Sequence, residues 1–497
     1  MHDLVAGHNI VQGLFAHAFG ARYELPIPLV AFILGGAAVV AASFAVVLPT
    51  RVRAAPDATA QDQTALRRVG PVAGPLGLVV VGLLCWAGFA GSQTVPENIL
   101  PTVFWVYLWV VLPLLCGLFG DITSGTNPFG YLAQLTDSQR LRIALFGSAE
   151  IVGWPRWLGW WPAAVLAALG TLAELVFNAS TTVPRFIAVM LVLYALVNLV
   201  MGAVFGAPAW RQRGELFSVL FATWGRLGWF RFGAPGRRGF AGGLEAPFEP
   251  TVSRSVFVLL LLVSISFDGL LSTPQWSQLE KRTFTLGNTG GIATFRTLSF
   301  LLLVAAIYAL FTLFAVGVSA AGARHRSITA TLSSLLPSLV PIAFGYLLAH
   351  YLQYISVNGQ LILPLLGAPG GSGTNLHLPF PLNDSYEVHA HFLPNGFYWY
   401  LDVVVIVAVH IVAVVLAHRQ LGRTGRTPAL ARRAEYPWII AMVAYTSLSL
   451  WLLAQPLTET GAAKTPAAQA IASLSADVTG ARTSQPMPTT PEPAGRR

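Results

Sequence analysis

Charged residues are scarce in this chain: Asp, Glu, Lys and Arg together make up 10% of its 497 residues. A soluble domain of ordinary composition carries about a quarter. Hydrophobic residues make up 55%, and the mean hydropathy is +0.63. This composition excludes an ordinary water-soluble domain and indicates an integral membrane protein.

Cysteine is nearly absent as well, since Cys85 and Cys116 are the two in the chain. We expect them in neighbouring membrane spans at different depths, so a disulfide is not predicted, and no Cys-based metal motif is present. The chain also lacks a Walker loop, a GxGxxG fingerprint, a GxSxG elbow and an HExxH helix. An ATP-driven pump and a serine hydrolase are therefore unsupported.

Apolar runs long enough to cross a bilayer recur along the whole chain. We predict ten transmembrane helices, because a chain in lipid must satisfy its backbone hydrogen bonds within each segment. Their expected ranges are 26–48, 74–92, 100–119, 161–178, 185–206, 255–272, 298–320, 336–356, 398–418 and 437–455. The predicted fold class is all-α, a polytopic helical bundle.

Three regions follow from these ranges: an N-terminal segment (1–25), a ten-helix membrane domain (26–455) and a C-terminal tail (456–497). The first segment lacks the basic and apolar pattern of a cleavable signal peptide. The tail is rich in Ala, Thr, Ser and Pro, and we expect it to be disordered.

The orientation is predicted from arginine and lysine, which concentrate in cytoplasmic loops. Successive loops between the predicted spans lie on opposite sides of the membrane. The loops on one side are 51–68, 120–160, 207–254, 321–335 and 419–436. They carry 21 of the 30 Lys and Arg residues. We therefore place these loops inside and both termini outside, in a bacterial cytoplasmic membrane.

The net charge of +9 belongs mostly to these loops. It indicates contact with the anionic headgroups of a lipid bilayer. Nucleic-acid binding is not predicted, because it needs basic residues clustered on a folded domain with aromatic residues between them.

The longest inner loop contains apolar and aromatic residues at helical spacing over 214–232. This pattern predicts an amphipathic helix that lies at the inner membrane interface, anchored by Trp224 and Trp229.

Three ionisable side chains are expected at one depth, close to the outer surface. Asp268 falls about one turn below that surface at the end of the sixth span, because each helical residue rises about 1.5 Å. Glu174 on the fourth span and His350 on the eighth fall at a similar depth. Histidines of the outer segments that face the same side are His17, His389 and His391.

This convergence is the main functional signal, because carboxylates within a membrane usually mark a site. Asp268, Glu174 and His350 are candidate catalytic groups, as a general acid–base pair or as ligands of a divalent metal ion. His17, His389 and His391 are candidate further ligands. The alternative is structural, with each side chain hydrogen-bonding a neighbouring helix.

Four stretches together resemble a known family. They read "AHAFGARYELPIPL" (16–29), "LFGDITSGTNPF" (118–129), "PAWRQRGELFSVLF" (208–221) and "SISFDGLLSTPQW" (264–276). Their order and spacing resemble a bacterial integral membrane family commonly labelled fenitrothion hydrolase, over about 16–455.

The resemblance implies hydrolysis of an organophosphorus triester at its P–O–aryl bond, by an enzyme that works with a related membrane subunit. No catalytic residue can be carried over. Members often have a His-Gly after a signal peptide; the matching stretch here is "AHAFG", with His17 and no preceding signal.

The leading expectation is thus a membrane-embedded, metal-assisted hydrolase of apolar phosphotriester-like compounds. An ion- or proton-coupled transporter that uses the same carboxylates is the first alternative. A non-catalytic subunit of a membrane complex is the second.

Overall fold

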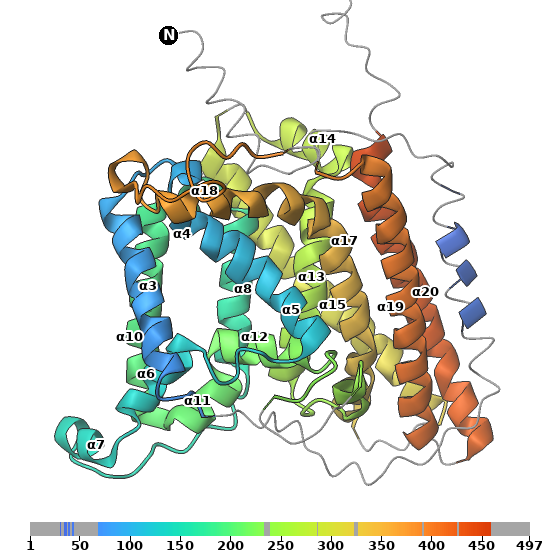
Figure 1. Ribbon diagram of the computed structural model, residues 1–497. Helices are drawn as coiled ribbons and strands as arrows, with labels where there is room; N and C mark the ends of the chain where they lie inside the picture. Colours follow the sequence, from blue (N-terminus) through green and yellow to red (C-terminus); the bar gives the residue numbers. More distant parts are fainter. Residues whose placement is uncertain are drawn as a thin grey trace, which may run out of the picture.

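The computed structural model describes residues 68–458 apart from 233–238, 286, 323–326, 390–391 and 425–426, together with isolated positions between 30 and 43. All regular elements in this part of the chain are helices (Figure 1). The α-helices are α3 (Ala73–Ala90), α4 (Ile99–Pro101), α5 (Leu112–Phe119), α6 (Pro128–Thr136), α7 (Gln139–Phe146), α8 (Trp161–Leu175), α9 (Asn178–Thr181), α10 (Pro184–Phe205), α11 (Ala207–Arg213), α12 (Leu216–Gly225), α13 (Val252–Leu271), α14 (Pro274–Thr283), α15 (Thr289–Ala320), α16 (Ile328–Leu335), α17 (Leu339–Asn358), α18 (Ile362–Gly367), α19 (Asn395–Thr424) and α20 (Pro428–Thr458). The tighter and wider turns are the 3₁₀ helices η1 (Val95–Glu97), η3 (Gly242–Glu245), η4 (Leu336–Ser338), η5 (Gly359–Leu361) and η6 (Ser372–Thr374), and the π-helix η2 (Thr102–Val111).

The chain is a multi-pass helical membrane protein. Seven helices of its described part are long and apolar enough to cross a bilayer. They are Ala73–Ala90, Ile99–Phe119, Pro184–Phe205, Val252–Leu271, Thr289–Ala320, Ile328–Gly367 and Gly396–Arg423.

The count therefore differs from the ten that we predicted. The range 161–178 forms α8, whose 15 residues reach about 22 Å, less than the apolar core of a bilayer. The range 437–455 falls within α20, which is not among the seven. The range 26–48 lies mostly outside the described residues.

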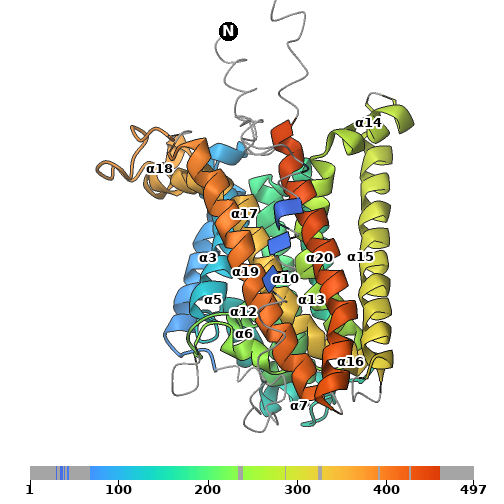
Figure 2. The same ribbon diagram turned by 90° about the vertical axis from the view of Figure 1, so that its right-hand side faces the viewer.

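The connecting segments lie at two ends of the bundle. In Figure 1, α14 and α18 lie at the upper end, whereas α7 and α11 lie at the lower end. Figure 2 places α16 at the lower end too. The described parts of the arginine-rich loops 120–160, 207–254 and 321–335 thus share one end, as alternation requires. The upper end is the one we expect to face outward.

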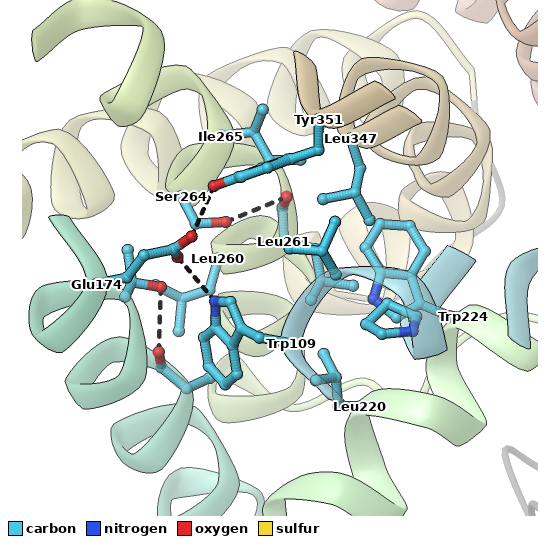
Figure 3. A pocket seen from close by; sticks show the side chains of 14 residues that line it. Trp109, Glu174, Leu220, Trp224, Leu260, Leu261, Ser264, Ile265, Leu347 and Tyr351 are labelled. Carbon is cyan, nitrogen blue, oxygen red and sulfur yellow. Dashed lines mark hydrogen bonds between the residues drawn. The ribbon is translucent and has the colours of Figure 1, made fainter. Parts of the chain in front are cut away.

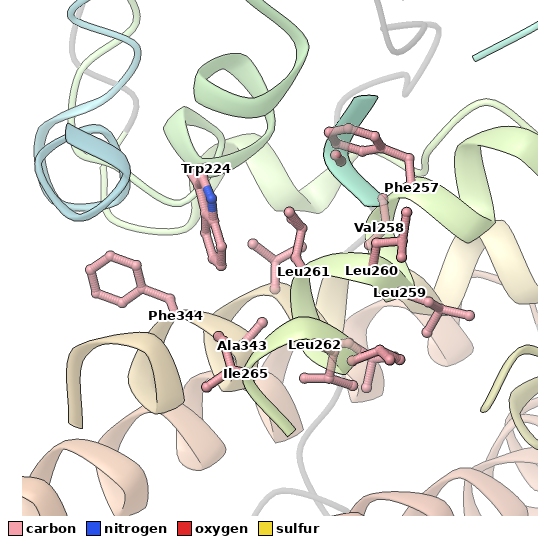
Figure 4. Close-up of a cluster of buried hydrophobic side chains, with 14 of the residues drawn as sticks. Trp224, Phe257, Val258, Leu259, Leu260, Leu261, Leu262, Ile265, Ala343 and Phe344 are labelled. Carbon is pink, nitrogen blue, oxygen red and sulfur yellow. The ribbon is translucent and has the colours of Figure 1, made fainter. Parts of the chain in front are cut away.

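Helix α13 lies at the centre of the bundle. Fifteen of its 20 residues are buried, because it is apolar on all sides and packs against α8, α15 and α17. Figure 4 shows leucines of α13 beside Phe344 of α17 and Trp224 of α12. Helix α15, in contrast, exposes leucines such as Leu302 and Leu313 along its length and would face lipid.

The segment 214–232 does not form the interfacial helix that we predicted. Its helical part, α12, is ten residues long and every one of them is buried. The side chain of Glu215 caps α12 by accepting from the backbone N–H groups of Phe217 and Ser218. Trp224 is 3% exposed within the bundle, and Trp229, beyond the helix, is 50% exposed. The aromatic residues of α12 therefore pack inside the protein instead of anchoring it to lipid.

Candidate functional site

Three of the predicted site residues meet near the upper end of the bundle. Asp268 lies on α13, His350 on α17, and Glu174 near the end of α8. Nε2 of His350 lies 2.7 Å from Oδ2 of Asp268, and both side chains are buried. The hydroxyl oxygen of Tyr351 lies 2.8 Å from Oε1 of Glu174 and 3.2 Å from Oδ2 of Asp268. We call Glu174, Tyr351, Asp268 and His350 the carboxylate cluster.

The proton count of this cluster is informative. A tyrosine hydroxyl has one proton to donate, and an ionised carboxylate only accepts. The hydroxyl of Tyr351 can therefore donate to Glu174 or to Asp268, but not to both at once. Its second contact is a hydrogen bond only when one of the two carboxyl groups is protonated and donates to the phenol oxygen. The geometry accommodates one added proton between Glu174 and Asp268.

Glu174 has a further partner in Trp109, whose indole Nε1 donates to Oε2 over 2.7 Å. Trp109 belongs to η2, a π-helix of ten residues in the middle of the span Ile99–Phe119. Such helices are rare, usually last one turn, and often occur at functional sites. The wider turn of η2 changes which side chains share a face, and Trp109 reaches α8 from it.

A cavity lies beside Glu174 and Tyr351, toward the middle of the bundle (Figure 3). It has about 60 Å³ of space for the centres of water molecules. A water molecule takes up about 30 Å³ in the liquid, so the cavity has room for about two waters. Figure 3 shows Glu174 at one side of the cavity and Trp224 at the other, with Trp109 between them.

The other predicted ligands are not part of the cluster in the described residues. His389 is exposed in the outer loop, where its backbone bonds to Gln360 and its ring packs against Tyr386. His17 and His391 lie outside the described residues. Within the described part of the chain, no three His, Cys, Asp or Glu side chains are placed to hold a metal ion. Tyr351 separates Glu174 from Asp268, which explains why the three predicted ligands do not form such a group.

The sequence did not point to Tyr351 or Trp109 as members of the site. Tyr351 follows His350 directly. Together with the nearby Tyr354, it has the pattern that is typical of the aromatic end of a membrane span. Trp109 lies in an apolar run, and the composition of such a run does not distinguish a π-helix from an α-helix. A tyrosine beside an intramembrane histidine was the one available signal.

The two cysteines, Cys85 and Cys116, are free, and both are buried. Comparisons with protein-family models, with curated proteins and with solved structures find no significant match for this chain. The carboxylate cluster and the cavity are therefore the features of the molecule that bear on its function.

Proposed function

We propose that this protein is a proton-coupled transporter of the bacterial cytoplasmic membrane, and that the carboxylate cluster is its proton-binding site. The observation that carries this proposal is the position of the Tyr351 hydroxyl between the carboxyl groups of Glu174 and Asp268. Loading and release of one proton are the reversible step that coupling requires.

The surroundings of the cluster support transport. Buried ionisable groups in a membrane bundle commonly mark a proton or ion pathway. The cavity beside Glu174 is lined by two elements that depart from a regular spanning α-helix, the π-helix η2 through Trp109 and the short buried helix α12 through Leu220 and Trp224. Stretches of π-helix within α-helices often occur at functional sites.

Infrared titration of the purified protein in lipid tests the proton site. A step in pH should produce the absorption change of a titrating carboxyl group, and Glu174→Gln and Asp268→Asn should each remove or shift it. Asp384→Asn, in the exposed outer loop, is the matched control and should leave the change intact. A titration that is the same in all four proteins would overturn the proposal.

Proton movement is the second measurement. Proteoliposomes with a pH-sensitive dye inside and an imposed membrane potential should acidify with wild-type protein. The two cluster variants should slow this by about tenfold or more, because each removes a hydrogen-bonding charge worth about 1.5–3 kcal/mol. Wild-type flux no higher than that of empty liposomes would count against transport.

A second candidate is the hydrolase implied by the family resemblance. It is favoured by the 2.7 Å contact between His350 and Asp268, since a histidine oriented by a buried carboxylate can act as a general base. A metal-assisted form would need ligands beyond these two, such as His17. An aryl phosphotriester is larger than a cavity of about 60 Å³, so its binding would require the bundle to open.

Release of nitrophenol from a nitrophenyl phosphotriester separates the two candidates. Membranes with wild-type protein should release it faster than membranes with Asp268→Asn, with and without a chelator, if the chain is a hydrolase. Equal rates from both membranes would leave the transporter as the supported function.

A further inference from the structure

The wall of the cavity has an unusual distribution of hydrogen-bonding groups. Fourteen residues line it, and ten of them are apolar or tryptophan. Among the described residues of the wall, Glu174 is the one acidic residue, and no basic residue is present. The remaining polar residues are Thr171, Ser264 and Tyr351.

The donors of this wall are already used. The hydroxyl of Thr171 donates to the backbone oxygen of Ala167, and that of Ser264 to the backbone oxygen of Leu261. Trp109 and Tyr351 donate to Glu174, as the dashed lines of Figure 3 show. The remaining donor is the indole of Trp224, across the cavity from Glu174 in the same view.

What the cavity offers a ligand next to Glu174 is therefore hydrogen-bond acceptance. A carboxylate has about four acceptor positions, and Trp109 and Tyr351 occupy two of those of Glu174. Anions and neutral carbonyl compounds need donors, which this end of the cavity lacks. A cation with N–H groups meets an acceptor, a negative charge and apolar walls.

The aromatic side chains strengthen the same preference. Indole and phenol rings attract cations through their electron-rich faces, most strongly where water is excluded. Trp109, Trp224 and Tyr351 all contribute to this wall. The space for about two waters limits the ligand to about two or three non-hydrogen atoms.

We propose that the cavity binds a compact organic ammonium ion, of the size of methylammonium or ethylammonium, with its N–H groups on Glu174 and its carbon atoms against the tryptophans. This deepens the proposed function, on which it rests: the cation enters as Glu174 releases its proton. One positive charge replaces another, so the net charge of the buried site is unchanged.

Binding of radiolabelled methylammonium to the purified full-length protein tests the proposal. Binding should be saturable at pH 8 and should weaken as the pH falls, because protons compete for Glu174. Ethylammonium should displace the label, and ethanol, which is neutral, should not. Glu174→Gln should weaken binding about tenfold or more, since a hydrogen bond to a charged group is lost.

Two further variants distinguish a loss of the binding group from a loss of folding. Glu174→Asp keeps the charge and should retain methylammonium binding that Glu174→Gln loses. Glu387→Gln, in the exposed outer loop, should bind as the wild type does. Absence of saturable binding in the wild type, or equal binding by Glu174→Gln, would overturn the proposal.

The infrared titration distinguishes this failure from that of the proposed function. A titrating carboxyl group with no methylammonium binding would leave the proton site standing and reject the ammonium ligand. Methylammonium binding without a titrating carboxyl group would reject proton coupling instead.

Discussion

At the scale of single residues, Tyr351 connects the two carboxyl groups that the chain places far apart in sequence. Its hydroxyl lies within hydrogen-bonding distance of both Glu174 and Asp268. His350, the neighbouring residue on the same turn of α17, makes a hydrogen bond with Asp268. Two adjacent residues of one helix thus bind one carboxylate, and only Tyr351 extends the contact to α8.

Tyr351→Phe should break the proton connection while the rest of the cluster stays in place. We expect proton flux in proteoliposomes to fall about tenfold, and the free energy of unfolding to fall by about 1–3 kcal/mol because a buried acceptor loses its donor. Tyr107→Phe is the matched control, since the hydroxyl of Tyr107 donates to the backbone oxygen of Gly359 instead. Equal loss of flux in both variants would show a structural role for Tyr351.

Asp121 is a second titratable residue, at the lower end of the bundle beyond α5. Burial raises the pKa of Asp121 to about 6, although its carboxylate accepts from the hydroxyl and the backbone N–H of Thr123. The unfolded chain has a pKa near 3.9 for this group. A raised pKa in the folded state means that its stability contribution is complete below about pH 4 and is lost as the pH rises through 6.

Asp121→Asn should therefore flatten the pH dependence of stability between pH 4 and 7. Thermal unfolding in detergent, followed at several pH values for the wild type and the variant, measures this. A wild-type midpoint that does not fall over this range relative to the variant would contradict the assignment.

At the scale of elements, the site is built by helices that depart from regular spans. The span Ile99–Phe119 begins as α4, continues as the π-helix η2 and ends as α5. Helix α12 crosses only part of the bundle and packs chiefly on α5. Gly117 permits a close approach on α5, because a side chain there would collide with the ring of Phe344. These contacts bring Trp109 and Trp224 to opposite sides of one cavity.

Helix α14 is tied to α15 at the upper end of the bundle. Nε and Nη2 of Arg296 donate to the two carboxylate oxygens of Glu280 over 2.6 and 2.8 Å, and Trp276 donates to the same group. Burial raises the pKa of Glu280, but these hydrogen bonds lower it more, so that its pKa lies below the ordinary value. This stabilisation is present above about pH 4.3 and is lost as the pH falls.

Glu280→Gln should remove that stabilisation. We expect a loss of about 1 kcal/mol at pH 7, modest because water screens a partly exposed pair. The loss should shrink as the pH falls through the lowered pKa of Glu280, because the carboxylate is then protonated in the folded protein too. Thermal midpoints of both proteins, followed from pH 7 downward, measure the difference. A variant that is equally less stable across the whole range would show that the charge is not the cause.

At the scale of the whole molecule, the bundle has a buried centre and an apolar outer surface. Helices α13 and α17 are buried over most of their length, and α3, α10 and α15 expose valine and leucine side chains. Exposed apolar helices around a buried pair are the arrangement expected of a protein solvated by lipid. The carboxylate cluster sits on the buried pair, away from that surface.

The predicted orientation can be tested by labelling. Ser148→Cys lies in an exposed loop at the lower end, and Ser385→Cys lies in an exposed loop at the upper end. A membrane-impermeable maleimide should label Ser385→Cys in intact cells and Ser148→Cys only after permeabilisation. The native cysteines are buried and should react slowly. The reverse labelling pattern would show that the protein has the opposite orientation to the one predicted.

The sequence by itself determined the membrane class, most of the spans and the depth of the charged residues. These depend on local composition, because each apolar run must satisfy its own backbone in lipid. Asp268, Glu174 and His350 could be placed at one level for the same reason: helical rise converts position in a span into depth.

Tertiary structure decided which side chains touch at that level. Rotation of each helix about its axis depends on packing with neighbours, so the link from Asp268 through Tyr351 to Glu174 could not be read from spacing. The fate of 214–232 depends on packing in the same way. Its aromatic residues suit a lipid interface and a protein core equally, and packing against α5 and α8 is what places α12 inside the bundle.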